Sequence, residues 1–273
     1  MVSLELEARL DNLLSTAQKE TEDIDLFAPI AEKEDCPICM IPLPLSESEL
    51  TFMTCCGKKI CMGCTWKDVK NSEKKGLLDH EMICAFCRRP EDENPIKSLK
   101  KLMKKKNPTA FIRMGIHYKE GDGVFQSDTK ALEMFICSAE LGHVEAYGVI
   151  GICYRLGTAV KENISKALEF YKVAAKKGAV IAHLTLAHFY TNTGDNNKRI
   201  KHLTVAARAG DKDSMDSMME AYRDKELSKE ELSQTLRAFQ ASTNEMKSKD
   251  RDDARLLEEA RQRGEALPAH LLM

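Results

Sequence analysis

Eight of the ten cysteines in this 273-residue sequence fall within one short stretch, and this cluster constrains the fold more than any other feature. Three cysteine pairs have two residues between them, and a fourth pair is adjacent. A Cys-x-x-Cys turn lets two sulfurs reach the same side of a tight loop, and tetrahedral zinc needs two such pairs for a closed four-sulfur site. In a reducing compartment such a cluster indicates metal binding before disulfides. The sequence therefore predicts two structural zinc ions bound by Cys36, Cys39, Cys55, Cys56, Cys61, Cys64, Cys84 and Cys87.

The adjacent cysteines, in "MTCCGKKIC" (53–61), allow more than one interpretation. They could be small core residues, or Cys56 could be a ligand with Lys58 in the place of a histidine ligand. The second alternative fails because an ammonium group has no lone pair to donate. We favour a third, in which Cys55 and Cys56 both bind and Gly57 supplies the unusual backbone angle that neighbouring ligands need. A four-thiolate zinc site carries a charge of about −2, and the basic residues expected to offset it are Lys58, Lys59, Arg88 and Arg89.

The order and spacing of the four pairs resemble the RING finger, in the all-cysteine form also seen in RING domains related to the U-box. The stretches "CPIC", "CCGKKICMGC" and "CAFCRRP" carry this likeness. In that family the pairs interleave, the first with the third and the second with the fourth. The resemblance implies one site made of Cys36, Cys39, Cys61 and Cys64 and another made of Cys55, Cys56, Cys84 and Cys87. Because a 52-residue segment has little core of its own, each zinc ion would supply on the order of 10 kcal/mol of folding free energy.

The same resemblance implies a possible E3 ubiquitin ligase, which would hold a charged ubiquitin-conjugating enzyme beside a substrate and catalyse by orientation. Closed four-sulfur shells leave no position for water, so we expect no catalytic residue and no cofactor other than zinc. Asp68 stands where active members have an aromatic or apolar residue, and Ala85 where proline is common. These departures favour the alternative, a non-enzymatic scaffold. The candidate contacts for the conjugating enzyme are Ile38, Trp66 and Arg88. Ile38 could equally be a packing residue and Arg88 a counter-charge, whereas for Trp66 we favour a role as the core anchor of the small module.

From residue 107 onward the sequence repeats itself with an offset of 36 residues. The stretch "AFIRMGIHYKEGDGVFQSDTKALEMFICSAELGHVEA" from Ala110 aligns with "AYGVIGICYRLGTAVKENISKALEFYKVAAKKGAVIA" from Ala146. A third copy starts at Ala182 and is four residues shorter in its loop. Each copy is expected to form two antiparallel helices that bury an apolar face only when stacked on their neighbours.

Local signals place the ends of these helices. Ser127 or Asp128 is expected to begin the second helix of the first copy, and Asn163 that of the second. The second copy has Ala159 where the first has Gly123, and a positive φ angle there would cost about 1 kcal/mol. Glycines fall where a helix ends in a left-handed residue, at Gly142, Gly178 and Gly210.

The pattern of alanine, glycine, tyrosine, a G-x-G-V turn, K-A, an aromatic residue and A-A-x-x-G resembles Sel1-like repeats, which are related to tetratricopeptide repeats. That resemblance implies an adaptor that binds a substrate or another protein partner on the repeat surface. The five histidines of the repeats share no metal-ligand spacing and are expected to be surface or core residues. Cys137 and Cys153 are expected to be small buried residues.

The remaining segments have weaker signals. "KSLKKLMKKK" (97–106) holds six lysines and could be a nuclear-localisation or nucleic-acid patch. We favour the solvated face of a linker helix. Ser228 and Glu231 form a capping box that opens a further helix. The first thirty residues predict a short acidic helix and a linker, with no evident role. The N-terminus has no signal-peptide pattern, and no apolar run is long enough to span a membrane.

We therefore expect a mainly α-helical protein, with a small zinc-bound RING-like α+β module, a Sel1-like α-solenoid and a helical C-terminal extension. The net charge of −2 points to no partner. Protein partners are expected, whereas nucleic acid, a membrane and a small-molecule substrate are not, and the expected location is the cytoplasm or the nucleus. The expected segments are 1–30 (helix and linker), 31–95 (RING-like module), 96–106 (basic linker), 107–222 (solenoid) and 223–273 (C-terminal extension and tail).

Overall fold

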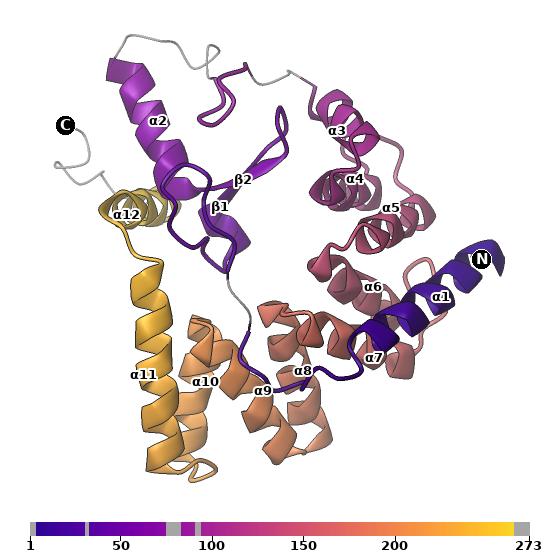
Figure 1. Ribbon diagram of the computed structural model, residues 1–273, viewed down its shortest axis with the longest axis vertical. Helices are drawn as coiled ribbons and strands as arrows, with labels where there is room; N and C mark the ends of the chain where they lie inside the picture. Colours follow the sequence, from indigo (N-terminus) through magenta and orange to yellow (C-terminus); the bar gives the residue numbers. More distant parts are fainter. Residues whose placement is uncertain (1–3, 31–32, 75–82, 91–93, 265–273) are drawn as a thin grey trace. The chain divides into compact units, whose positions relative to one another are not determined.

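The computed structural model describes residues 4–30, 33–74, 83–90 and 94–264 (Figure 1). The chain forms two compact units, each assembled from two separate segments. The repeat unit comprises Met1–Ala31 and Leu99–Ser242, and the cysteine unit comprises Glu32–Ser98 and Thr243–Met273. The expected mainly helical fold is confirmed, and in the described residues the expected small α+β module contains one β-hairpin. The predicted module boundary at residue 31 and the last nine residues of the predicted tail lie outside the described residues.

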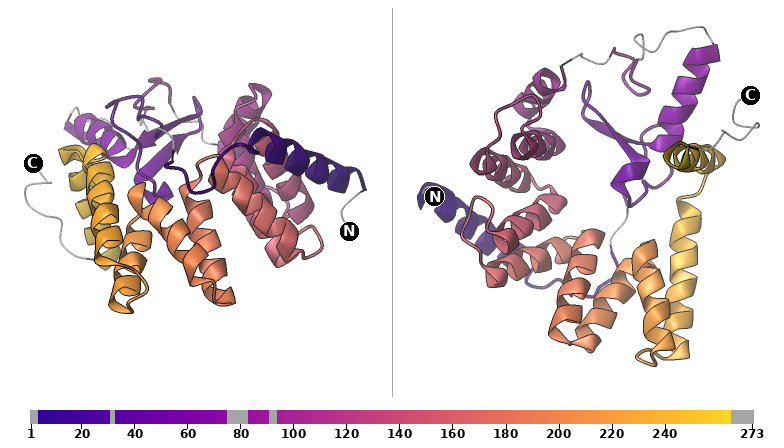
Figure 2. Two further views of the ribbon diagram at one scale, coloured as in Figure 1. Left: turned by 60° about the horizontal axis from the view of Figure 1, so that its bottom comes forward. Right: turned by 180° about the vertical axis from the view of Figure 1, so that it is seen from behind.

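Helices of the repeat unit follow one another in pairs joined by tight turns, and the two helices of a pair stay side by side in both views of Figure 2. The first repeat pairs α4 with α5, the second α6 with α7, and the third α8 with α9. No helix in the described part of the chain is long and apolar enough to cross a membrane. The bounds are α4 Pro108–Glu120, α5 Asp128–Glu140, α6 Val144–Leu156, α7 Ile164–Lys176, α8 Val180–Thr193, α9 Asn196–Arg208 and α10 Lys212–Arg223.

The predicted helix ends are confirmed, and they settle the choice left open at the start of α5. Ser127, rather than Asp128, is the N-cap, and its hydroxyl accepts a hydrogen bond from the Lys130 amide. Asn163 caps α7 in the same way. Ala159 has a φ of 63°, as the alignment with Gly123 predicts. Left-handed backbone angles are found at Gly142, Gly178 and Gly210.

Close contact between a helical glycine and an aromatic ring is the packing rule of the first two repeats. A Cβ atom built on Gly115 would lie 2.4 Å from the Phe135 ring, and one built on Gly151 would lie 2.6 Å from the Tyr171 ring. Both pairs join the first helix of a repeat to its second helix, so the missing side chain lets the ring lie against the backbone. At the matching positions the third repeat has alanine and leucine, which share one buried cluster, Ala187 and Leu203.

Substituting Gly151 by alanine is expected to destabilise the repeat unit by about 1–3 kcal/mol, because the buried Tyr171 ring has no space to move away. The midpoint of urea unfolding, followed by circular dichroism, measures this effect. Gly148, in the same helix, faces open space, so Gly148→Ala should stabilise the unit by about 0.5–1 kcal/mol. Adding Tyr171→Leu to Gly151→Ala should restore part of the loss, and equal effects of the two alanine substitutions would contradict the packing rule.

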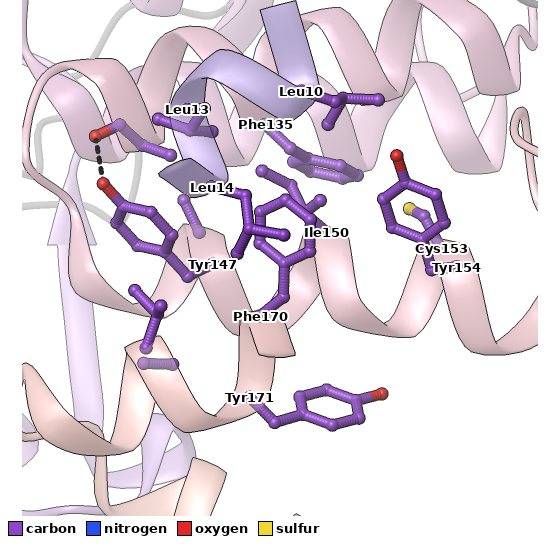
Figure 3. Packing of buried hydrophobic residues seen from close by; sticks show 14 of the residues in the cluster. Leu10, Leu13, Leu14, Phe135, Tyr147, Ile150, Cys153, Tyr154, Phe170 and Tyr171 are labelled. Atoms are coloured by element: carbon purple, nitrogen blue, oxygen red, sulfur yellow. Dashed lines mark hydrogen bonds between the residues drawn. The ribbon is translucent and has the colours of Figure 1, made fainter. Parts of the chain in front are cut away.

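Helix α1 (Leu4–Glu20) packs against α5 and α7, a role that the sequence interpretation missed. Leu10, Leu13 and Leu14 point into the core among Phe135, Tyr147, Ile150 and Phe170 (Figure 3). Polar pairs flank this contact, since Arg9 donates to Glu140 at 2.8 Å and Lys177 pairs with Glu20 at 2.7 Å. The N-terminal helix is therefore part of the core of the repeat unit and not a free extension.

The basic segment forms helix α3 (Pro95–Lys104), which begins at the Asn94 side chain. Its apolar side chains Ile96, Leu99 and Leu102 are buried, and its lysines are exposed, as expected for the solvated face of a helix. Helix α11 (Lys229–Glu245) begins with the predicted capping box of Ser228 and Glu231. Its side chains Leu232 and Phe239 pack against the cluster formed by α8, α9 and α10.

Two histidines form a buried pair between α8 and α9. Their Nδ1 atoms, in His183 and His202, lie 3.0 Å apart, and the aromatic rings of Phe27 and Tyr190 contact His202. Burial lowers the pKa of each histidine to about 4. The neutral imidazoles can share one hydrogen bond, whereas protonating both would place two charges in an apolar core.

Because the folded-state pKa values lie below the unfolded value of 6.5, the unfolded chain binds more protons between pH 6.5 and pH 4. The stability of the repeat unit should therefore decrease as the pH falls through this window, by on the order of 2–3 kcal/mol per histidine. Urea midpoints between pH 4.5 and 7.5 test this. The double variant His183→Leu/His202→Phe should flatten the dependence, and the exposed His188→Gln should not; equal slopes in all three proteins would contradict it.

Candidate metal centre

The cysteine unit contains β1 (Leu50–Met53), β2 (Lys58–Cys61), α2 (Met62–Lys74) and α12 (Lys249–Arg263). The two strands form an antiparallel hairpin in which Leu50 pairs with Cys61 and Met53 with Lys58. A short 3₁₀ turn, Glu47–Glu49, precedes β1. The hairpin supplies thiols at both of its ends: the adjacent cysteines lie in its turn, and Cys61 ends β2.

The first Cys-x-x-Cys pair lies in a tight loop closed by two backbone hydrogen bonds. The Met40 amide donates to the Cys36 carbonyl at 2.9 Å, and the Cys36 amide donates to the Ile41 carbonyl at 2.9 Å. Met40 has a φ of 55°, which turns the chain back on itself, and Asp35 forms a bridge with Pro42. This geometry aims the sulfurs of Cys36 and Cys39 at the same point.

The last Cys-x-x-Cys pair repeats this loop 48 residues later. The Arg88 amide donates to the Cys84 carbonyl at 2.9 Å, and the Cys84 amide to the Arg89 carbonyl at 2.8 Å. Arg88 has a φ of 58°, and Ile83 forms a bridge with Pro90. The signal was present in the sequence as a shared Cys-x-x-Cys-x-x-Pro pattern, in "CPICMIP" and "CAFCRRP", although the sequence interpretation did not compare the two stretches.

The adjacent cysteines occupy the hairpin turn, and the expected role of the following glycine is confirmed. Gly57 has a φ of 74°, and its amide donates to the Met53 carbonyl at 2.7 Å. This turn lets Cys55 and Cys56 point to one site even though they are neighbours in the chain. The interpretation of these residues as two members of one ligand set fits the structure better than the alternative with Lys58, whose ammonium lies 6.0 Å from the centre of the Phe86 ring.

Eight thiols meet in the two interleaved groups that the resemblance implied. One group is Cys36, Cys39, Cys61 and Cys64, and the other is Cys55, Cys56, Cys84 and Cys87, and within each group the sulfurs all lie within 4.8 Å of one another.

The spacing of the sulfurs suits a tetrahedral ion. Sulfur atoms 2.3 Å from a central zinc would be about 3.8 Å apart. In the first group the Cys36–Cys64 and Cys39–Cys61 sulfurs are 3.9 Å and 3.8 Å apart. In the second the Cys56–Cys84 sulfurs are 3.8 Å apart and the Cys55–Cys87 sulfurs 3.5 Å apart. Each group could therefore hold a metal ion with little movement of its ligands.

The pKa values of the thiols differ within each group. Burial would raise the pKa of Cys36, but neighbouring backbone amides outweigh it and lower the pKa to about 7. The backbone amide of Arg89 and the nearby thiols likewise lower the pKa of Cys87 against its desolvation. Burial raises the pKa of Cys55 and Cys64. A metal ion that binds to such a group would displace the protons of its neutral thiols.

The basic side chains near the groups have other partners as well. Lys59 lies 3.6 Å from Glu47, and Arg88 donates to Asp68 at 2.8 Å. Their role in offsetting thiolate charge stays a prediction. The sequence interpretation missed Arg251 of α12, whose Nη2 lies 3.5 Å from the Cys39 sulfur. Its neighbourhood "KDRDD" has the composition of an exposed helix, so no local signal indicates this contact.

The three proposed contact residues for a conjugating enzyme differ in exposure. Ile38 is 40% exposed on the first loop, and Arg88 is exposed on the last. Trp66 is partly buried on α2, whereas among the described residues the buried apolar side chains that cluster with the cysteines are Leu43, Met53 and Ile60. The interpretation of Trp66 as the main core anchor is therefore wrong.

Outside the two thiol groups, no other cluster of potential metal ligands occurs in the described residues. His183 and His202 lie in the core, as one of the expected alternatives had it. Cys153 is buried as predicted, whereas Cys137 is only partly buried and lies 3.6 Å from Arg9 Nη2. The prediction of a buried Cys137 is wrong, because its side chain remains partly exposed beside the Arg9 guanidinium.

Comparisons with known proteins support the repeats. A family model described as "Sel1 repeat" matches residues 110–143 and 144–178. A Sel1 repeat protein from Oxalobacter formigenes is similar in structure, with 25% identity and a TM-score of 0.49 over 68% of this chain and 82% of that one. The protective antigen c5321 from uropathogenic Escherichia coli has 20% identity and a TM-score of 0.47; the match covers 77% of this chain and 43% of that one. No curated protein matches the sequence.

The purified full-length chain, reconstituted with zinc, is expected to bind two ions, because the two thiol groups share no ligand. Elemental analysis against protein concentration measures this. Cys36→Ser and Cys84→Ser should each reduce the content to one ion or fewer, whereas Cys137→Ser should retain two. A wild-type chain with one ion or none, or full occupancy in either ligand variant, would show that the thiol groups are not closed metal sites.

Proposed function

We propose that this protein is a zinc-dependent interaction scaffold in which the Sel1 repeats recruit a protein partner and the cysteine unit acts as a RING-type ubiquitin ligase module. The observation that carries the proposal is the pair of interleaved four-thiol groups. All-thiolate tetrahedral sites favour zinc, and a closed shell makes the metal structural rather than catalytic. Reduced thiols of this kind fit the cytoplasm or the nucleus.

Exposed apolar side chains on the two matching loops support a surface for a protein partner. Ile38 and Phe86 occupy equivalent positions, each immediately before the second cysteine of its loop, and they are 40% and 41% exposed. Met40, on the first loop, is 69% exposed. Apolar side chains held by a rigid metal loop lose little conformational entropy on binding, which favours their use as contacts. A conjugating enzyme is the partner that the RING resemblance implies for this surface.

A second candidate function, a scaffold without ligase activity, is favoured by one ion pair. Arg88, the residue that would contact both the conjugating enzyme and ubiquitin, donates to Asp68 of α2 at 2.8 Å. The pair would have to open before Arg88 could contact a partner. Because both groups lie at the surface, with side-chain exposures of 62% and 19%, the pair is worth about 1 kcal/mol or less. Opening the Arg88–Asp68 pair would lower the rate of a ligase but would not abolish its activity.

Discharge of ubiquitin from a panel of charged conjugating enzymes distinguishes the two functions. The zinc-loaded wild type should accelerate discharge, and Ile38→Ala and Arg88→Ala should each reduce the rate at least about tenfold, the loss expected from 1.4 kcal/mol of transition-state contact. Asp68→Asn should preserve or increase the rate because it releases Arg88.

The matched control is Arg89→Ala, which removes the neighbouring exposed arginine and should leave the rate unchanged. Zinc content and circular dichroism confirm that each variant is folded. If the fully loaded wild type discharges no enzyme of the panel, the scaffold function replaces the ligase function.

A further inference from the structure

We propose that Arg251 of α12 is a positioning residue for the first zinc site, and that it makes this site slower to release its metal than the second site. The inference rests on zinc binding as proposed above, but not on ligase activity. Arg251 follows the last cysteine of the unit by more than 160 residues and is still 9% exposed, within the cysteine unit. A charged side chain is rarely buried to this extent unless it is paired.

The guanidinium of Arg251 connects the loop of Cys39 to α12. Its Nη1 donates to the carbonyls of Pro42 at 2.6 Å and Met246 at 2.7 Å. Its Nη2 donates to the Ile41 carbonyl at 3.1 Å and lies 3.5 Å from the Cys39 sulfur. The carbonyls of Ile41 and Pro42 lie at the closing end of the metal-binding loop, so these bonds hold the segment from which Cys39 projects.

Helix α12 packs against α2, and the two helices lie next to each other in Figures 1 and 2. This packing holds Arg251 in place beside the Cys39 loop. A Cβ atom on Gly63 would lie 2.7 Å from the Arg251 amide nitrogen, so only glycine allows the approach. Lys67 of α2 pairs with Asp250 at 2.9 Å. Ser248 caps the first turn of α12 through the Arg251 amide.

The two thiol groups therefore differ in their surroundings. In the first, three of the four cysteines are buried, and Arg251 places a positive charge beside the partly exposed Cys39. In the second, Cys84 is buried and the other three cysteines are partly exposed. A guanidinium hydrogen bond stabilises a metal-bound thiolate, because it offsets negative charge on the sulfur, and a fixed ligand is harder to displace than a mobile one. A metal ion is released only after one of its ligands has left. The first site should therefore release zinc more slowly than the second.

Zinc transfer from the loaded full-length chain to the chromogenic chelator 4-(2-pyridylazo)resorcinol tests the proposal. The wild type should release two ions in two resolved phases. Arg251→Gln should accelerate the slow phase at least about tenfold, the lower end of the effect of losing such a partner, and leave the fast phase unchanged. Arg251→Lys keeps the charge but not the planar fork, so it should restore only part of the slow rate.

Pulsed alkylation with mass spectrometry assigns the phases. Cys55, Cys56 and Cys87 should be labelled early in the wild type, and the thiols of the first group late. Arg255, on the same helix, is exposed and pairs with Asp252, so Arg255→Gln should leave both phases unchanged. Gly63→Ala should accelerate the slow phase as Arg251→Gln does, because it displaces α12 without removing a charge.

The outcomes separate this inference from the proposed function. Fewer than two zinc ions in the wild type would overturn zinc binding itself. Two ions with equal release rates in wild type and Arg251→Gln would overturn the role of Arg251 alone. Equal acceleration of both thiol groups in Arg251→Gln would also overturn it, since that result indicates general loss of folding. If Arg251→Gln does not load two ions, Arg251→Lys provides the comparison: a slow phase as slow as in the wild type would overturn the role of the guanidinium.

Discussion

The cysteine unit depends on holding eight thiols in two groups whose members interleave along the chain. Each group takes one pair from a Cys-x-x-Cys loop at an end of the segment and one pair from its middle. Few apolar side chains are buried between them, and those that are, Leu43, Met53 and Ile60, lie directly beside the cysteines. Metal ions bound by these groups, as we propose, would take the part that a hydrophobic core takes in a larger domain.

The repeat unit is stabilised by a different interaction, the fit of one helix against the next. In the first two repeats a glycine of the first helix lies against an aromatic ring of the second helix. In the third repeat Ala187 and Leu203 occupy the matching positions. Both arrangements keep the combined volume nearly constant, as close packing requires. Helix α1 extends this core with leucines that contact the same rings. The unit can therefore present a stable surface to a protein partner without any metal.

Much of this architecture could be predicted because its signals are local. The spacing of the cysteines predicted two four-thiol sites, and the RING resemblance implied which residues form each one. Ser127, Asn163 and the helix-ending glycines placed the repeat helices correctly. Docking of α1 and α12 could not be predicted in this way. The sequence of an amphipathic or charged helix indicates which face is buried and which is solvated. It does not indicate which distant part of the chain the helix packs against. Arg251 illustrates this, since its partners in the Cys39 loop, Ile41 and Pro42, lie more than 200 residues earlier in the chain.

Amide hydrogen exchange with and without a zinc chelator tests the central claim most directly, that metal coordination and the docking of α12 form one cooperative structure. The account predicts that removing the metal abolishes protection in β1, β2 and α12 together, while α4 to α9 remain protected. If the strands and α12 kept their protection in the metal-free chain, the cysteine unit would not depend on its thiol groups for folding, and the account would be wrong.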